Sequence, residues 1–524
     1  MLPAFFIAIM HISANINLEA AHLSSDCDKM LAPYIAKSLH ILPDDIISYK
    51  ICKRSIDARH RSNVRLLYAL EVELRDAVRP SGEFAPAKME DAWRPPERTS
   101  LHNPLIVGAG PAGLFAALVL AEAGAEPIVI ERGYDVETRQ HDISAFLSTR
   151  RLNPESNYLF GEGGAGTWSD GKLYTRVHDV RCSYVLRTFA ECGAPSEIQY
   201  FAHPHIGSDL LPGVIAALRK RIIAAGGRFI WGTQIVDVIG DRHFQALLTA
   251  NREKLEAPAT LIACGHSARR LILSLTKRIA FKMKPFQMGC RIEHPQSFIN
   301  EIRYGNKASY PALGAAEYQY SIASTANMPG ATTFCMCPGG MIIPATCQEN
   351  TLCTNGMSNS ARDGKYANSA IISTLAADTF TSPEEAFSFL ERIEADAFLK
   401  GGGDYTAPAQ KASDFLERKC SKHIQNGSYP LGMTPQALHT LATPVYAALA
   451  NALRAFDRQA RGFIPLGLLT GVETRVSSPV RFERMPDGAS SMPGLYLAGE
   501  GAGMAGGIVS AAIDGIKNAE AMMQ

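Results

Sequence analysis

The stretch Pro104-Leu-Ile-Val-Gly-Ala-Gly-Pro-Ala-Gly113 decides the fold of this 524-residue chain. The apolar run 104–107 predicts a short buried strand, and residues 111–123 predict a helix that begins directly after a glycine-rich turn. A second apolar run, 127–130, follows and ends at Glu131. Strand, turn, helix and strand in this order predict a βαβ unit with parallel, buried strands, the start of an α/β domain.

The glycine-rich turn has the spacing of a dinucleotide-binding fingerprint. Gly108 permits the tight turn, Gly110 lets the backbone approach a pyrophosphate, and Gly113 lets the helix pack closely on the strand. The helix N-terminus adds unpaired N–H groups and a positive dipole for the phosphates. Glu131, 23 residues after Gly108, can accept hydrogen bonds from both ribose hydroxyls and repels a 2′-phosphate, which favours FAD or NAD over NADP.

The C-terminal segment Gly494-Leu-Tyr-Leu-Ala-Gly-Glu-Gly-Ala-Gly-Met-Ala-Gly-Gly-Ile508 distinguishes FAD from NAD. It predicts a strand that enters a second glycine-rich turn, followed by a helix over 509–522. This second turn would bring the backbone, one acid (Glu500) and a second helix N-terminus close to a ligand. Such an arrangement suits a long cofactor whose ribityl chain and flavin ring extend beyond the first pyrophosphate site. NAD alone would not need this second turn, so the sequence predicts non-covalently bound FAD.

These paired turns resemble the glutathione-reductase-type FAD superfamily. The resemblance implies that Gly499 and Glu500 hold ribitol and pyrophosphate, and that residues 506–508 lie under the isoalloxazine ring. Residues 261–265 resemble the superfamily's strand beside the adenosine end, with Cys264 where Thr is usual. The residues expected at the cofactor are Gly108, Ala109, Gly110, Pro111, Ala112, Gly113, Glu131, Arg132, Gly164, Thr167, Lys172, Ala263, Gly265, Gly499, Glu500, Gly506, Gly507 and Ile508.

A narrower resemblance covers most of the chain. Its longest segments are Phe160-Gly-Glu-Gly-Gly-Ala-Gly-Thr-Trp-Ser-Asp-Gly-Lys-Leu173 and Gly471-Val-Glu-Thr-Arg-Val-Ser-Ser-Pro479, and shorter ones lie at 54–59, 204–207, 288–295, 334–340 and 355–358. Together they resemble a poorly characterised family of FAD-dependent dehydrogenases, or oxidoreductases, of bacteria and plastids, which have a small N-terminal domain and a C-terminal insert. The resemblance implies the family and the cofactor but little about the reaction, because the family's own substrate is not established.

The chain divides at a proline-rich stretch and at a change of composition. Prolines between residues 79 and 103 forbid regular structure and predict a linker. We expect an α/β protein with a Rossmann-like FAD-binding domain of the glutathione-reductase type, an inserted α+β substrate domain and a small N-terminal α+β domain. The expected boundaries are 1–78 for the N-terminal domain, 79–103 for the linker, 104–285 and 466–524 for the two parts of the FAD-binding domain, and 286–465 for the inserted substrate or cap domain.

Local patterns give further expectations in the two smaller domains. Period-2 and continuous apolar runs predict strands, and apolar residues at helical spacing predict helices, one of which Pro33 interrupts. The predicted elements are strands at 2–10, 46–51 and 64–72, and helices at 18–39, 360–377 and 383–398.

Two cations, Lys172 and Arg176, follow a glycine-rich segment that falls where related flavoproteins fold a loop over the cofactor. A cation near the N1–C2=O edge of a flavin stabilises the anion of the reduced ring. The alternative is that both cations pair with surface acids such as Asp170 and Asp179. Lys172 is therefore a candidate both for cofactor binding and for catalysis.

Glu473 and Arg475 precede the C-terminal flavin segment and are the other catalytic candidates. An arginine at this place would anchor a carboxylate, a phosphate or a polarised carbonyl of the substrate. The alternative is an internal pair between Glu473 and Arg475.

Histidines and cysteines give weaker signals. His203, His205 and His294 could act as general acids, but such residues are more often structural. Cys335 and Cys337 form a C-x-C pair, which is poor geometry for a disulfide, and a second C-x-x-C for zinc is missing, so no metal is expected. A second GxGxxG for NAD(P)H is also missing, so a nicotinamide would dock transiently as a reductant.

The overall charge argues against a polyanionic partner. Lysine and arginine number 52 against 51 acids, a net charge of +1, so no overall field draws the chain to nucleic acid or an anionic membrane. Eleven cysteines at low density indicate a reducing compartment, and we expect a cytoplasmic protein. The exception is a basic stretch without an aromatic stacking platform. It consists of Lys50, Lys53, Arg54, Arg59, Arg61 and Arg65.

These observations predict an FAD-dependent oxidoreductase that transfers hydride at flavin N5 to or from an organic small molecule. The alternatives are an FAD-stabilised RNA-associated protein, which the basic stretch would serve, and a flavin redox sensor. Neither a membrane nor a nucleic acid is the expected partner.

Overall fold

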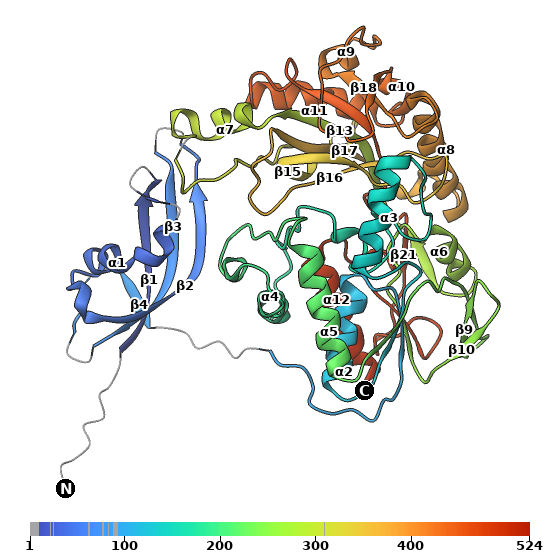
Figure 1. Ribbon diagram of the computed structural model, residues 1–524, viewed down its shortest axis with the longest axis horizontal. Coiled ribbons are helices and arrows are strands. Elements are labelled where there is room, and N and C mark those ends of the chain that lie inside the picture. The colour runs from blue at the N-terminus through green and yellow to red at the C-terminus, as the bar shows by residue number, and fades with distance from the viewer. Residues whose placement is uncertain are drawn as a thin grey trace.

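The computed structural model describes residues 10–524 except 21, 22, 25, 61, 62, 76, 77, 82, 87–92 and 309. It has three parts, a small N-terminal sheet, a parallel-sheet domain that contains both glycine-rich turns, and an insert with a large antiparallel sheet (Figure 1). The insert lies against the parallel-sheet domain, and the N-terminal sheet stands beside both.

The N-terminal domain is a four-stranded antiparallel sheet in the order β2-β3-β1-β4 with a helix on one face. Alternate residues of its central strand are buried, as a sheet with one covered face requires. Its elements are β1 (Met10–Glu19), α1 (Ala32–Leu39), β2 (Ile46–Asp57), β3 (Arg65–Leu74) and β4 (Phe84–Pro86).

The expected helix over 18–39 is wrong in its first half. Leu18 belongs to β1, whose side chains alternate between buried and exposed, and the helix occupies only 32–39. Pro33 lies in the first turn of that helix, where a missing N–H costs nothing, so it begins the helix instead of interrupting it. The strand expected at 2–10 lies outside the described residues except for Met10. Strand β4 lies within the expected linker.

The parallel-sheet domain has five strands in the order β22-β11-β5-β6-β7, and every neighbouring pair is parallel. The carboxyl ends of these strands therefore meet at one edge, where ligands of such sheets bind. The strands are β5 (Leu105–Val107), β6 (Ile128–Ile130), β7 (Arg228–Ile230), β11 (Thr260–Ile262) and β22 (Leu495–Leu497).

Helices cover this sheet, and α2 is buried almost all round. Gly515 of α12 approaches α2 so closely that a side chain there would collide with the Ala112 carbonyl. The helices are α2 (Pro111–Glu122), α3 (Val136–Thr149), α4 (Arg181–Glu191), α5 (Leu211–Ala224), α6 (Arg269–Thr276) and α12 (Ile508–Met522). Two small sheets accompany them, a meander of β8 (Ile235–Ile239), β9 (Ala246–Thr249) and β10 (Lys254–Glu256), and the pair β12 (Phe281–Met283) with β21 (Val480–Phe482).

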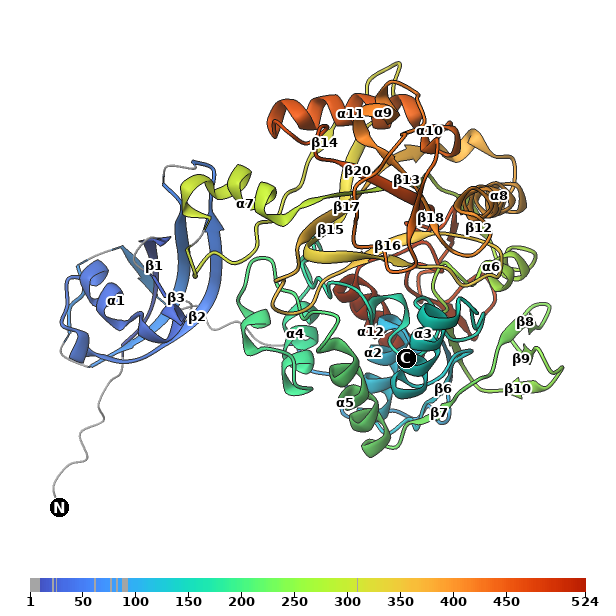
Figure 2. The same cartoon turned by 45° about the horizontal axis from the view of Figure 1, so that its top comes forward.

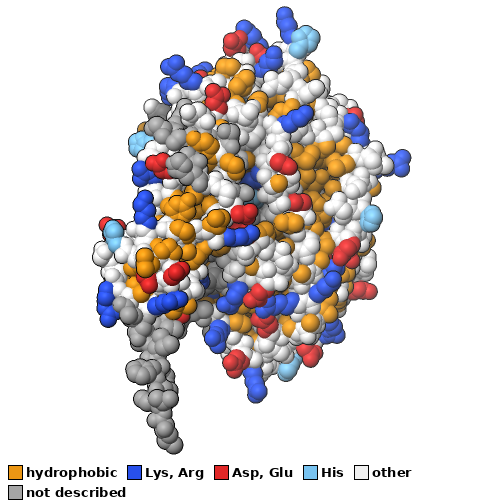
Figure 3. Space-filling model, turned by 60° about the vertical axis from the view of Figure 1, so that its left-hand side comes forward, with side chains coloured by type: hydrophobic (Ala, Val, Ile, Leu, Met, Phe, Trp, Pro, Cys, Tyr) orange, Lys and Arg blue, Asp and Glu red, His pale blue; other side chains and the backbone are white. Residues whose placement is uncertain are grey.

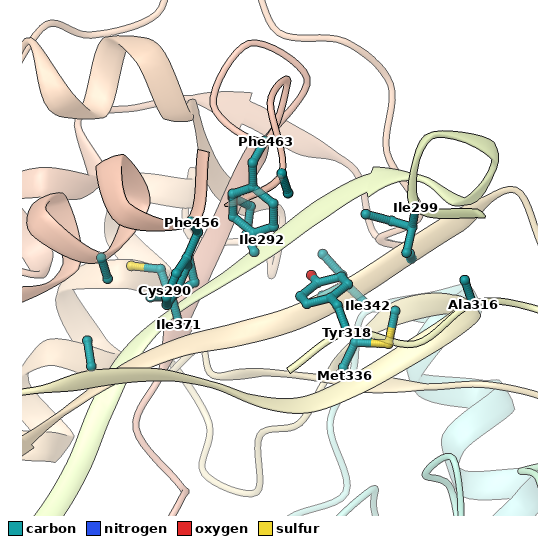
Figure 4. Packing of buried hydrophobic residues seen from close by; sticks show 14 of the residues in the cluster. Cys290, Ile292, Ile299, Ala316, Tyr318, Met336, Ile342, Ile371, Phe456 and Phe463 are labelled. Carbon is teal, nitrogen blue, oxygen red and sulfur yellow. The ribbon is translucent and has the colours of Figure 1, made fainter. Parts of the chain in front are cut away.

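The insert is an eight-stranded sheet with helices on its outer face (Figure 2). Phe456 of helix α11 and Phe463 after it pack on Cys290, Ile292 and Ile371 of the central strands (Figure 4). The strands are β13 (Phe286–Pro295), β14 (Ser321–Ile322), β15 (Ala331–Pro344), β16 (Thr354–Met357), β17 (Tyr366–Leu375), β18 (Ala407–Lys411), β19 (Met433–Pro435) and β20 (Leu468–Glu473). The helices are α7 (Gln296–Tyr304), α8 (Pro383–Gly401), α9 (Ala412–Leu416), α10 (Leu438–Leu441) and α11 (Tyr446–Gln459).

Two expectations for the insert differ from the structure. The segment 360–377 is not a helix, since β17 lies between β13 and β15 and is buried on both faces, which hides the period-2 pattern of a strand. Strand β20 pairs with β13 and β18, so the insert sheet extends beyond the expected boundary at 465 to Glu473. The helix expected at 383–398 is present as α8.

No helix in the described part of the chain is long and apolar enough to cross a membrane.

Candidate functional site

A cavity of about 1190 Å³ lies at the carboxyl edge of the parallel sheet and reaches the insert. Ligand pockets for drug-sized molecules measure roughly 300–1,000 Å³, so this cavity has room for a cofactor and a small second ligand. Both glycine-rich turns line it, as do Phe334 and Asn355 of the insert sheet. The chain thus brings together segments 400 residues apart, from Gly108 to Ile508.

The three glycines of the first turn serve different needs. A side chain at Gly108 would collide with the Ala263 carbonyl, and one at Gly113 with the Gly108 carbonyl, so the protein itself requires both glycines. At Gly110 the nearest atom is the Cα of Gly164, 4.0 Å from an added Cβ. That room belongs to the cavity, as expected where a phosphate approaches the backbone.

Two helix N-termini converge on the cavity. Helix α2 begins after Gly110, which provides no side-chain cap, and α12 begins after Gly507. Residues at the start of both helices line the cavity. Their backbone N–H groups and positive dipole ends suit the phosphates and the electron-rich edge of a flavin, so the donor set fits FAD.

Glu131 directly follows β6 and is 6% exposed at the cavity wall. Its carboxylate accepts hydrogen bonds from the backbone N–H groups of Ala109 (2.9 Å), Gly133 (2.9 Å) and Gly161 (3.1 Å). A carboxylate has about four acceptor positions, so about one remains for a ribose hydroxyl. Contact with both hydroxyls, as the sequence suggests, requires Glu131 to release one of these N–H groups.

The remaining expected cofactor residues divide between the cavity wall and the layer behind it. Arg132 lies in the wall, where its guanidinium pairs with Glu155 (2.8 Å) and stacks on Phe160 (3.9 Å). Thr167 lies behind the wall, where its hydroxyl donates to the Glu162 carbonyl (2.9 Å), and Ala109 and Gly113 also support the wall from behind. The others in the wall are Gly108, Gly110, Pro111, Ala112, Gly164, Lys172, Ala263, Gly265, Gly499, Glu500, Gly506, Gly507 and Ile508.

Lys172 lies in the wall and also makes the ion pair that the alternative hypothesis proposed. Its ammonium pairs with Asp170 (2.9 Å) and donates to the Met336 carbonyl. Burial opposes the charge of Lys172, but Asp170 and the other acidic neighbours together outweigh it, so the pKa of Lys172 is raised and the group stays charged. Arg362 binds the same carboxylate (2.6 Å), which leaves Lys172 only part of its counter-charge. Arg176 is exposed and is not part of the cavity wall.

Glu473 and Arg475 do not pair with each other. Glu473, at the end of β20, faces the neighbouring strand and pairs with the fully buried Arg291 of β13 (2.9 Å). It lies behind the cavity wall, so the expectation that it faces the flavin or the substrate is wrong. Arg475 lies in the wall and pairs with Glu394 of α8 (2.8 Å).

The histidine and cysteine candidates are held by the surrounding structure. His294 contacts the Phe463 carbonyl (2.8 Å), and burial lowers the pKa of His294 to about 4, so it is neutral near pH 7. His203 contacts Glu317 (3.1 Å), and His205 contacts the Ser360 carbonyl (3.1 Å). Burial raises the pKa of Cys337 to about 12, which makes it a poor nucleophile. The described residues contain no cluster that could hold a metal ion.

Arg139 was missed by sequence reasoning because nothing in helix 136–149 distinguishes it. Its guanidinium is fully buried, donates to the carbonyls of Asn157 (2.7 Å) and Glu162 (2.6 Å), and lies over the Trp168 ring (4.5 Å). Burial lowers the pKa of Arg139 to about 9. These contacts fix the glycine-rich loop whose residues 164–166 line the cavity.

Three of the five described cations in the basic stretch of the N-terminal domain pair with acids. Lys50 pairs with Glu71 (3.4 Å), Arg54 with Asp28 (3.0 Å) and Arg59 with Asp57 (2.6 Å), while Arg61 lies outside the described residues. Positive and negative side chains are interspersed over this side of the molecule (Figure 3). The pairing neutralises part of the positive charge of this stretch.

Comparisons with known proteins cover the three parts. An FAD binding domain family matches residues 103–143, a family described as "FAD-dependent protein, C-terminal domain-like" matches 285–476, and a domain of unknown function matches 10–73. An uncharacterised protein of Clostridium beijerinckii is 38% identical over 525 residues, which span 97% of this chain and 98% of that protein.

Similar solved structures are distant. CtdE in complex with FAD is 12% identical with a TM-score of 0.32, covering 80% of this chain and 83% of that one. The flavin-dependent brominase Bmp2 is 10% identical with a TM-score of 0.37, covering 81% and 79%. A geranylgeranyl bacteriochlorophyll reductase-like protein from Thermoplasma acidophilum is 12% identical with a TM-score of 0.35, covering 80% and 77%.

TM-scores this low say nothing about the reaction. The two FAD-related family matches, by contrast, agree with the first glycine-rich turn and with the limits of the insert sheet, and the relative matches nearly the full chain. The chain belongs to a family of FAD-dependent proteins that join an FAD-binding domain to this C-terminal domain.

Proposed function

We propose that this protein is an FAD-dependent oxidoreductase that transfers hydride between flavin N5 and an organic small molecule held against the insert. The observation that carries the proposal is one cavity whose wall has two parts. The parallel-sheet domain supplies the two glycine-rich turns, and the insert supplies amide and aromatic side chains. FAD, when bound, supplies the hydride chemistry, and the chain positions the reactants.

The cofactor side of the cavity has a defined role for each group. The start of α2 would hold the diphosphate, and Glu131 a ribose hydroxyl. Glu500 is oriented by the backbone N–H of Ser478 (2.9 Å) and by Lys284 (3.3 Å), which supports a contact with the ribityl chain. We retain the glutathione-reductase-type assignment within this proposal, and the five-stranded parallel sheet with its separate three-stranded meander supports it.

The substrate side combines two cations, Lys172 and Arg475, with neutral and aromatic groups. Lys172 would place its positive charge where the reduced flavin becomes anionic, which favours hydride acceptance by the ring. Gln287, Asn355, Phe334 and Tyr174 line the same cavity. Amide groups and partly exposed aromatic rings suit a small organic substrate with carbonyl or hydroxyl groups. Arg475, kept as a catalytic candidate, would orient an anionic group.

The partners follow from the same chemistry. NADH or NADPH would act as a transient reductant, because the glycine-rich turns are assigned to FAD. The paired charges of the N-terminal strands weigh against the RNA-associated alternative. We expect the protein to act in the cytoplasm, where its eleven cysteines would stay reduced.

The test is the visible spectrum of the purified protein, recorded without oxygen before and after adding NADH and then NADPH. We expect a flavin band. Rapid bleaching by one nicotinamide establishes a reductase, whereas a band that neither bleaches indicates a dehydrogenase reduced by its own substrate, or a sensor that is reduced without turnover. Failure to bind FAD, even when it is added to the apoprotein, contradicts the proposal.

A further inference from the structure

Arg475 lies where the chain returns from the insert to the parallel-sheet domain, and its side chain is 3% exposed. Its Nη2 donates to Glu394 (2.8 Å) and to the side-chain oxygen of Gln348 (3.0 Å). Its Nε and Nη1 are buried and have no hydrogen-bond partner among the described residues. Because Arg475 belongs to the cavity wall, an acceptor that enters the cavity is the partner these donors can gain.

The surrounding ion pairs hold Arg475 in place and leave it cationic. Glu394 accepts hydrogen bonds from Arg269 (2.6 Å), Arg475 and the Thr474 hydroxyl (2.6 Å). Burial acts to raise the pKa of Glu394, but the two arginines outweigh it and lower that pKa to about 2. One carboxylate is therefore shared between two guanidinium groups, so part of the positive charge remains.

A second feature points to an anion at the same place. Helix α6 begins here without a side-chain cap, and residues 267–270 at its start line the cavity. A helix N-terminus attracts anions.

The acids near this place are already paired or exposed to solvent. Glu391 accepts from the Gln348 amide (3.2 Å) and lies 3.7 Å from Arg269. Glu349, also in the wall, is exposed. The acids therefore leave the orphaned donors of Arg475 available to a ligand.

We propose that Arg475 and the start of α6 form a phosphate-binding subsite, in addition to the cradle at the start of α2. The inference rests on the proposed function, since the phosphate belongs either to the diphosphate of FAD or to a phosphorylated second ligand beside it. The subsite makes Arg475 a binding residue for an anion.

Binding measurements with Arg475→Gln distinguish the two sources. If the diphosphate of FAD contacts Arg475, the variant apoprotein loses about 10- to 100-fold in FAD affinity and keeps its affinity for riboflavin, which has no phosphate. If a second ligand supplies the phosphate, FAD affinity is unchanged, and the wild-type holoprotein binds inorganic pyrophosphate about 10- to 100-fold more tightly than the variant.

Thr474→Val is the matched control, because it removes a hydrogen bond to Glu394 without changing the cavity wall. It should bind FAD, riboflavin and pyrophosphate as the wild type does. The proposal is overturned if folded Arg475→Gln behaves like this control toward all three probes, or if it loses FAD and riboflavin equally. Should the wild type bind no FAD, the proposed function fails, while titration of wild-type and variant apoprotein with pyrophosphate still tests the subsite.

Discussion

The two walls of the cavity differ in the share of backbone and side-chain groups that form them. The wall on the parallel-sheet side consists mainly of backbone, with glycines, two helix N-termini and a carboxylate that binds three backbone N–H groups. Buried ion pairs between distant residues support the wall on the insert side. Arg291 and Glu473 are 182 residues apart, Arg269 and Glu394 are 125, and Arg362 and Asp170 are 192.

This difference explains what each wall can do. A backbone wall binds phosphate and ribose, which every FAD has in common, and it tolerates little change in the cradle itself. A wall of side chains can vary in charge and shape, so it can select a substrate. Its cost is that each buried charge depends on a partner in another part of the chain.

The largest expected effect concerns the buried ion pair that supports the insert-side wall. Replacing Glu473 by Leu leaves the fully buried Arg291 without its carboxylate, which should lower the free energy of unfolding by about 3–5 kcal/mol. Urea denaturation followed by circular dichroism measures this change. The double variant Glu473→Leu/Arg291→Met removes both charges and should recover most of the loss. An equally large loss in the double variant would show that packing, rather than the ion pair, is responsible.

The second prediction concerns a single methyl group added to the wall on the parallel-sheet side. Gly113→Ala drives a Cβ into the Gly108 carbonyl, and because neither atom belongs to a flexible side chain, we expect a loss of about 3 kcal/mol in unfolding free energy. Thermal denaturation of the apoprotein measures it.

Gly110→Ala is the matched control, since its φ of −78° suits any residue and the nearest atom to the new Cβ is 4.0 Å away. This variant should fold like the wild type and bind FAD more weakly, because the methyl group occupies the place of the diphosphate. If both variants lose the same stability, the distinction between the two glycines is wrong.

The sequence predicts the backbone wall because its parts are contiguous. Gly108 to Gly113 with Glu131, and Gly499 to Ile508, each lie within one short segment, so spacing alone indicates the strand, turn and helix. Arg139, Arg291 and Glu394 could not be predicted in the same way, because each acquires its partner only when distant segments pack. The prediction of a helix where strand β17 lies was wrong for a related reason, since burial on both faces removes the alternation that identifies a strand.

The third prediction concerns Glu131, the carboxylate in the backbone wall. Glu131→Gln turns one acceptor oxygen into a donor and removes the charge that holds three backbone N–H groups. We expect FAD affinity to fall about 30-fold, or about 2 kcal/mol. Quenching of flavin fluorescence on binding to apoprotein measures it. Glu155→Gln, which weakens a partly exposed pair with Arg132, should change the affinity by less than about 1 kcal/mol. Equal losses would assign the effect to net charge instead of to the geometry of Glu131.

The smallest expected effect is at Lys172, where the two walls meet. Its ammonium lies in the cavity wall and shares Asp170 with Arg362, so part of its charge is unneutralised. A cation beside a flavin stabilises the anionic reduced ring, so Lys172→Met should lower the two-electron potential of the bound flavin. We expect a shift of about 30 mV, equal to about 1.4 kcal/mol, measured by anaerobic titration against a reference dye. Arg176→Met removes an exposed cation that is not part of the cavity wall and should leave the potential unchanged. If Lys172→Met also leaves it unchanged, Asp170 neutralises Lys172 fully, and the insert-side wall would hold the substrate without tuning the flavin.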